Sequence, residues 1–146
     1  MAFGNPYAAY QTTAVKTASQ GKLVVMLYQG LERELTSASN NFGNTDKLPA
    51  AKIEDFGKHI MKAQEIINEL QVSLDMDKGG QIAQNLMSLY VYFNKELMSV
   101  SINQDKGKLI TVLEMIKQLG SAWEAASANT AADSVPQAQR TLNITG

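Results

Sequence analysis

A regular spacing of apolar residues over residues 53–74 restricts the fold of this chain more than any other feature. Apolar side chains recur there at alternating steps of three and four, and these are Ile53, Phe56, Ile60, Ala63, Ile67, Leu70 and Leu74. Because an α-helix turns once in about 3.6 residues, this spacing places them in one seam along a single helix. Such a seam has to be covered by other helices, so the rest of the chain is expected to supply them.

Three other segments have the same helical spacing, and turn-forming sequences separate them. One helix is expected from about Ser19 or Gln20 to about Ser39, with Ser19 as its N-cap, and the sequence NNFGNTDKLP ends it. The helix that carries the first seam should run from about Ala50 to Leu74 and end at DMDKGG. Two more are expected at 81–102 and 106–128. Their seams are Ile82, Leu86, Leu89, Phe93, Leu97 and Val100, and Leu109, Val112, Ile116, Leu119, Trp123 and Ala126.

The short connections and the lack of period-two alternation predict an all-α fold, an antiparallel up-down four-helix bundle. We divide the chain into an N-terminal leader or cap at 1–18, the helical bundle at 19–128 and a flexible tail at 129–146. The tail is expected to be flexible because small polar residues cannot offset their ordering entropy by burial. The three prolines, Pro6, Pro49 and Pro136, are all expected in non-helical chain.

Composition and motifs argue against several function classes. The net charge is −1 without a basic run, which argues against a nucleic-acid partner, and there are no cysteines for disulfides or thiolate metal sites. No apolar run approaches the ~20 residues that span a bilayer and no signal peptide is visible, so we expect a cytoplasmic protein without membrane insertion. The single histidine, His59, lacks the Glu-x-x-His spacing of a bundle metal site, and Glu65 with Glu69 is expected to be a solvated face. We therefore predict no catalytic residues, cofactor or metal.

The helices carry more apolar side chains than their seams use. Residues 23–28 are apolar in succession, so they point all the way round the first helix. A second stripe, rotated by one residue from the third seam, contains Ala83, Met87, Tyr90, Met98 and Ile102. The surplus fits either a wide core stripe or an interaction surface, and methionines suit a surface that repacks around a partner. Trp123 continues its seam, so we expect it in the core.

Several motifs occur in the order and spacing of a known family. The chain opens with NPYAAYQTTAVKTASQGKLVVMLYQGLEREL, in which Tyr7 and Tyr10 precede a Val-x-Thr-Ala-Ser turn and a Lys-Leu-x-x-Met-Leu-Tyr helix. KAQEIINELQVSLDMDKGGQIAQNLMSLYVYF and LGSAWEAA follow in the middle and near the end. Over roughly residues 5–127 the chain resembles the flagellin-specific export chaperones, the FliS family. It departs from the family pattern at Gln20, where a proline is usual, and at Gln29 and Val91, where an acidic residue is frequent.

The resemblance implies a cytoplasmic helical bundle without catalytic activity. Such a protein binds the C-terminal helical segment of flagellin in hydrophobic grooves, prevents premature polymerisation and presents flagellin to the flagellar export apparatus. The N-terminal segment would cover part of the groove when the client is absent, and the client-free protein could be a homodimer. The candidate client-binding residues are Tyr7, Tyr10, Met26, Leu27, Tyr28, Ile66, Met87, Tyr90, Val91 and Met98. Two alternatives remain open, a structural helical-bundle homo-oligomer and a bundle enzyme or metal carrier.

Overall fold

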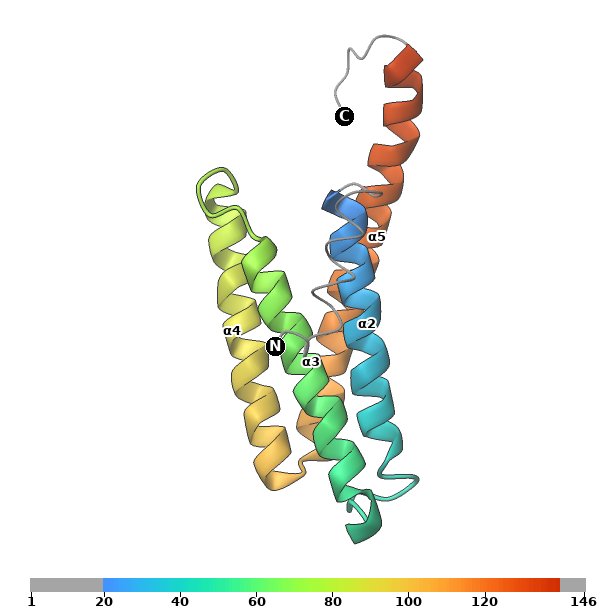
Figure 1. Ribbon diagram of the computed structural model, residues 1–146, viewed down its shortest axis with the longest axis vertical. Helices are drawn as coiled ribbons and strands as arrows, with labels where there is room; N and C mark the ends of the chain where they lie inside the picture. The colour runs from blue at the N-terminus through green and yellow to red at the C-terminus, as the bar shows by residue number, and fades with distance from the viewer. Residues whose placement is uncertain (1–19, 140–146) are drawn as a thin grey trace, which may run out of the picture.

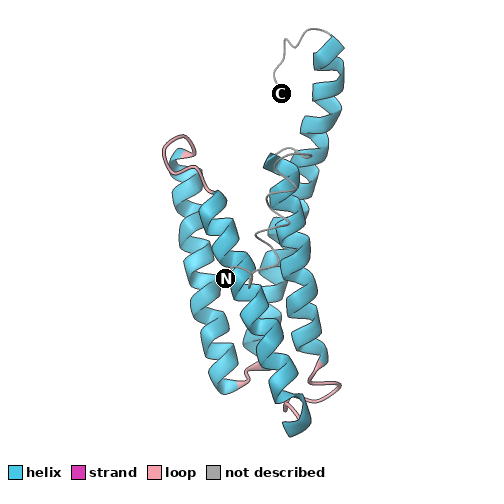
Figure 2. Cartoon of the chain, viewed as in Figure 1, coloured by secondary structure: helices cyan, strands magenta, loops and turns pink. Residues whose placement is uncertain are grey.

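The computed structural model describes residues 20–139, and all regular structure in that range is helical (Figures 1 and 2). The elements in chain order are α2 (Gln20–Asn40), the short 3₁₀ helix η2 (Ala50–Lys52), α3 (Ile53–Ser73), α4 (Gly80–Asn103) and α5 (Lys106–Gln139). The four long helices run alternately up and down and pack side by side (Figure 1). The predicted all-α four-helix bundle is confirmed.

The helix bounds follow the sequence prediction closely except at the end of the chain. The last helix continues past Ala128 to Gln139 and includes Pro136, so the predicted end and the non-helical placement of Pro136 are wrong. The stretch AASANTAAD between Glu124 and Ser134 holds several alanines and no glycine or proline, so nothing in it stops a helix. Ser19 lies outside the described residues, and the division into leader, bundle and tail stays a prediction.

The core explains the apolar run in the first helix. α2 packs most extensively of all the helices, against both α3 and α5, so two neighbours bury a wide arc of its surface. Leu23, Leu27 and Leu31 are each at most 1% exposed. The remaining core comes from the α2–α3 connection and from α3, α4 and α5, and its largest members outside α2 are Phe42, Phe56, Ile60, Ile66, Ile67, Tyr90 and Phe93.

One end of the bundle is closed by polar and aromatic contacts around the α2–α3 connection. The Phe42 and Phe56 rings meet edge to face with centroids 5.4 Å apart, and Lys106 Nζ lies 5.7 Å from the centroid of Phe42. Asn41 is buried there and its side-chain amide donates to Asp55 Oδ2 at 3.1 Å. These contacts join α2, α3 and α5 where the chain turns.

The opposite end is open. There the α3–α4 hairpin diverges from α2 and α5, as Figure 1 shows, and α4 has the least extensive packing of the four helices. The seam of α4 loses its cover there, and Ile82, in its first turn, is 70% exposed. At the closed end Ile53, the first residue of α3, is 46% exposed as well. The prediction that the seams are buried is therefore wrong for Ile82 and Ile53, and also for Ala126, which is exposed on α5, because the neighbouring helices do not reach over these side chains.

Candidate binding surface

A group of exposed apolar side chains lies on the outer surface of the α3–α4 hairpin. On α4, Val91, Met98 and Ile102 recur at steps of seven and four, so they share one side of the helix. On α3, Met61 and Val72 are eleven residues apart, which also places them on one side. We call these five residues the α3–α4 face; each is between 53% and 73% exposed.

Polar contacts between the two helices show that their exposed sides adjoin. Asn94 Nδ2 of α4 donates to Asn68 Oδ1 of α3 at 3.0 Å, and Gln64 Nε2 donates to the Asn94 carbonyl oxygen at 3.4 Å. Both bonds lie between Met61 and Val72 along α3. A shallow depression runs beside them, with Met98 and Lys95 on its α4 side. The exposed sides of α3 and α4 therefore adjoin at these amides, and Met98 lies beside them.

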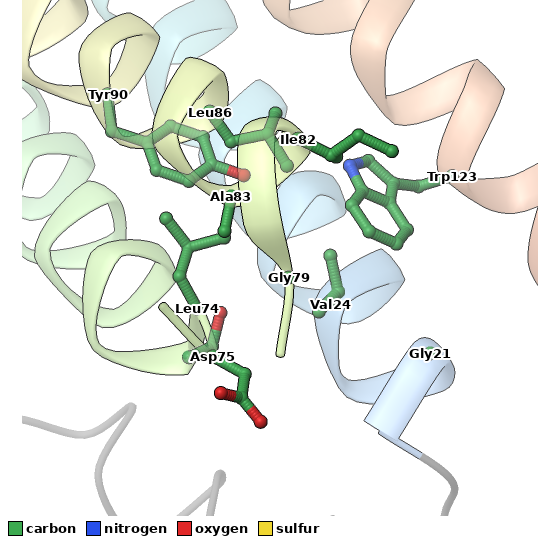
Figure 3. A pocket seen from close by; sticks show the side chains of 11 residues that line it. Gly21, Val24, Leu74, Asp75, Gly79, Ile82, Ala83, Leu86, Tyr90 and Trp123 are labelled. Atoms are coloured by element: carbon green, nitrogen blue, oxygen red, sulfur yellow. The ribbon is translucent and has the colours of Figure 1, made fainter. Parts of the chain in front are cut away.

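A separate apolar pocket lies at the open end of the bundle, where all four helices contribute (Figure 3). Its volume is about 220 Å³. The rings of Tyr90 and Trp123 lie on opposite sides of it. The other lining residues are Gly21 and Val24 of α2, Ser73, Leu74, Asp75 and Gly79 around the α3–α4 turn, and Ile82, Ala83 and Leu86 of α4. We call this the open-end pocket.

The α3–α4 turn that borders the pocket has a fixed shape. Asp75 Oδ1 accepts hydrogen bonds from the backbone N–H groups of Asp77 and Lys78 at 3.1 and 2.9 Å, and the Gly79 N–H donates to the Asp75 carbonyl at 2.8 Å. A Cβ on Gly79 would lie 2.6 Å from Ala83 Cβ and 2.7 Å from the Asp75 carbonyl, which is too close for any side chain. Gly80 has φ +55°, a conformation that favours glycine. Both glycines are therefore required by the turn.

A pair of tyrosine hydroxyls lies behind the open-end pocket. Tyr28 Oη and Tyr90 Oη are 2.7 Å apart and both side chains are buried, but only Tyr90 lines the pocket. Burial raises the pKa of Tyr28 above its usual value and its interactions with Tyr90 raise it further, whereas a hydrogen bond from the Trp123 side chain lowers it. Burial also raises the pKa of Tyr90, and its hydrogen bond with Tyr28 lowers it. Both phenols are neutral at physiological pH.

The predicted site residues fall into four groups. Val91 and Met98 are exposed on the α3–α4 face, and Met26 and Met87 are partly buried. Leu27, Tyr28, Ile66 and Tyr90 are at most 1% exposed. These four side chains are covered because each lies between helices of the bundle. Tyr7 and Tyr10 lie outside the described residues. The part that each of them plays in binding stays a prediction.

The open-end pocket includes side chains that were not among the predicted site residues. Ile82 and Leu86 were expected to form a seam, and Trp123 was expected in the core. Trp123 is instead partly buried, packed against the core at the edge of the pocket. The only sequence signal for the open-end pocket is the Gly79–Gly80 pair. It marks the turn between α3 and α4, at the end of the bundle where the other helices cover these two least.

The single histidine makes structural contacts with two carboxylates. His59 Nδ1 lies 2.7 Å from Glu34 Oε1 of α2, and its Nε2 lies 3.3 Å from Asp55 Oδ2. The histidine thus links α2 to α3. Among the described residues no three histidine, cysteine or carboxylate side chains are grouped so as to hold a metal ion. None of the described helices combines the length and the apolar character needed to cross a membrane.

Comparison with known proteins identifies the family. Residues 3–130 match the family model described as flagellar protein FliS. The chain belongs to the FliS family. The flagellar secretion chaperone FliS of Bacillus subtilis is 32% identical over 126 residues, which cover 86% of this chain and 89% of the relative. That of Salmonella typhimurium is 33% identical over 116 residues, covering 79% and 82%, and that of Vibrio cholerae is 33% identical over 122 residues, covering 80% and 84%.

Two departures of this FliS-family chain from the family pattern now have places in the structure. Gln29 is exposed on α2 and its side-chain amide donates to Glu124 Oε2 of α5 at 3.4 Å. Val91 is exposed within the α3–α4 face. Val91 thus contributes an apolar side chain to that face, where the resemblance implies an acidic one.

Proposed function

We propose that this protein is a cytoplasmic, non-enzymatic export chaperone that binds the C-terminal helical segment of flagellin in its hydrophobic grooves. Binding would prevent premature polymerisation of flagellin and deliver it to the flagellar secretion apparatus. Membership of the FliS family supports the proposal, because the curated relatives are named flagellar secretion chaperones. The observation that carries it is the α3–α4 face, because five large apolar side chains exposed together usually mark an interaction site.

The size of the face favours a client that forms its own helix. Full burial of a large apolar side chain contributes about 1.5–3 kcal/mol, so five side chains already partly out of water contribute roughly 6 kcal/mol. Ordering a client backbone costs about 1–2 kcal/mol per residue, so the face alone orders only about three to six residues. An amphipathic helix adds its own backbone hydrogen bonds and presents apolar residues along one side. It therefore fits the face better than an extended chain.

The proposed contacts follow from exposure. Val91 and Met98 would touch the client directly, and Met26 and Met87 would do so at partly buried positions. Leu27, Tyr28 and Ile66 are buried, so they would act on the client only through the packing of the core. Tyr90 lines the open-end pocket and would be reached from there. We further propose that the leader, residues 1–18 with Tyr7 and Tyr10, covers a groove while the client is absent.

Copurification tests the proposal. Full-length flagellin should copurify with this protein in a stable complex, and flagellin that lacks its C-terminal segment should not. Equal recovery of the two flagellins would refute the choice of segment, and recovery of neither would refute the function.

The alternative is a structural homo-oligomer in which the α3–α4 face is permanently buried between copies. The same exposed side chains favour it, since a second copy would also remove them from water. Light scattering separates the two functions. A chaperone that dimerises only without its client should become a one-to-one complex when flagellin is added, whereas a structural oligomer keeps its mass.

A further inference from the structure

Two exposed methionines lie on the α3–α4 face. The chain has no cysteine, so its seven methionines hold all of its sulfur. Met61 and Met98 are 55% and 54% exposed, and both belong to that face. Two-electron oxidants such as hydrogen peroxide convert the thioether of methionine to a sulfoxide, which is polar. The face that is proposed to bind the client therefore carries two side chains that such an oxidant can modify.

The other methionines of the described range are better covered or lie elsewhere. Met26 and Met115 are partly buried and pack against the core. Met87 is also partly buried, and its sulfur accepts a hydrogen bond from Gln71 Nε2 at 3.6 Å. Met76 is 42% exposed, but it lies in the α3–α4 turn, outside the face. Burial keeps an oxidant away from the covered sulfur atoms, so the exposed methionines should react first.

Hydrogen-bond donors lie beside Met98 on the face. Met98 borders the depression that Gln64, Asn68, Asn94 and Lys95 also line. Each amide nitrogen carries two hydrogens, and the bonds from Gln64 to Asn94 and from Asn94 to Asn68 use one each. The Lys95 ammonium is a further donor. A sulfoxide oxygen accepts hydrogen bonds, so the free protein can accommodate an oxidised Met98 without unfolding.

We propose that Met61 and Met98 form a reversible oxidation site that weakens client binding at the α3–α4 face. A sulfur lone pair attacks one oxygen of hydrogen peroxide, so that an S–O bond forms and the O–O bond breaks. The sulfur loses two electrons, and the second oxygen leaves as hydroxide, which takes the remaining proton and becomes water. Methionine sulfoxide reductases reverse the change, with two thiols oxidised to a disulfide and the oxygen released as water.

The change in polarity acts on the complex more than on the fold. Both side chains are more than half exposed in the free protein, so their oxidised forms stay in contact with water there. An apolar client would remove that water and leave the sulfoxides without hydrogen-bond partners, which costs free energy that a thioether does not. This inference rests on the proposed chaperone function and names a regulation of its site.

Peptide mapping by mass spectrometry tests the selectivity. The full-length protein is treated with hydrogen peroxide at neutral pH, freed of the oxidant and digested, and each methionine is scored as thioether or sulfoxide over time. Met61 and Met98 should be oxidised before Met26, Met87 and Met115. Oxidation of these three covered methionines at the same rate as the two on the face would overturn the inference.

Binding of a flagellin C-terminal peptide tests the consequence. The protein is oxidised alone and freed of peroxide before the untreated peptide is added, so the methionines of the client stay reduced. Calorimetric titration should show an affinity at least about 10-fold below that of the untreated protein, and circular dichroism should be unchanged. Methionine sulfoxide reductases with dithiothreitol should restore the affinity. An unchanged affinity after oxidation overturns the inference and leaves the proposed function intact, whereas an untreated protein that binds no peptide overturns both.

Leucine variants assign the effect to the two sulfur atoms. Leucine is close to methionine in volume and has no sulfur to oxidise. The double variant that combines Met61→Leu with Met98→Leu is compared with itself before and after peroxide, and its affinity should not change. Met76→Leu is the matched control, because Met76 is exposed but lies outside the face. Peroxide should lower the affinity of this control as much as that of the wild type. Equal sensitivity of the double variant and the control to peroxide would contradict the inference.

Discussion

Substitution of Met98 by glutamate separates client binding from folding. Met98 is 54% exposed on α4, so the folded protein gains little from it, and methionine and glutamate have similar helix propensities. We expect the free energy of unfolding to change by no more than about 0.5 kcal/mol. A client that buries the exposed half of Met98 gains about 1 kcal/mol from it, which glutamate forfeits. Glutamate must also lose its hydration, so the affinity should fall by at least about 10-fold.

Ile67→Ala is the matched contrast. Ile67 is fully buried on α3, so its truncation should lower the free energy of unfolding by about 2–5 kcal/mol while the folded fraction still binds the client. Urea denaturation followed by circular dichroism measures the first quantity, and calorimetric titration with the flagellin C-terminal peptide measures the second. The reasoning is refuted if Met98→Glu destabilises the protein as much as Ile67→Ala, or if it binds the peptide as tightly as the wild type.

Three further predictions concern the tyrosine pair, the turn and the helix surface. Because burial raises the pKa values of Tyr28 and Tyr90 above the unfolded value of about 10, their contribution to stability is complete below about pH 10 and declines as the pH rises further. The double variant that combines Tyr28→Phe with Tyr90→Phe should therefore show a flatter stability profile in urea denaturation between about pH 9 and 11. Gly79→Ala should lower the melting temperature, because its Cβ would overlap Ala83 and the Asp75 carbonyl. Gly57 lies within α3, and nothing lies near the Cβ that Gly57→Ala would add. This substitution should raise the free energy of unfolding, measured by urea denaturation, by about 0.5–1 kcal/mol.

The architecture could be predicted because the spacing of apolar residues indicates the helices directly and the turn residues indicate where they end. The seam of α3 between Phe56 and Leu70 is buried, and the glycine pair at 79 and 80 lies where one helix gives way to the next. Helix starts were predicted well for the same reason. The end of α5 was predicted too early because a run of alanines with polar residues is compatible with either a tail or a helix. A single proline near a helix end also removes only one backbone hydrogen bond, so it does not have to end the helix.

The candidate site was harder to predict because the exposure of a side chain depends on which helix lies opposite it. The spacing of apolar residues along the chain carries no information about that helix. Ile66 and Met98 are each next to a seam residue in the sequence, yet Ile66 is buried between helices and Met98 is exposed. The heptad pattern assigns Ile82 to the seam of α4 as firmly as Phe93, although only Phe93 has helices over it. The divergence of the helices at one end, which creates the open-end pocket, is a property of the packed bundle.

The surplus apolar surface is therefore smaller than the sequence indicates, and it is divided between two places. α2 accounts for most of the reduction, because α3 and α5 together cover the run from Leu23 to Tyr28. What remains exposed is concentrated on the α3–α4 hairpin and at its open end. Since α4 has the least extensive packing of the four helices, it has the most surface left for a partner. A client that lies along α4 would reach the α3–α4 face through Met98 and the open-end pocket through Ile82, and would supply the cover that the bundle does not provide for that helix.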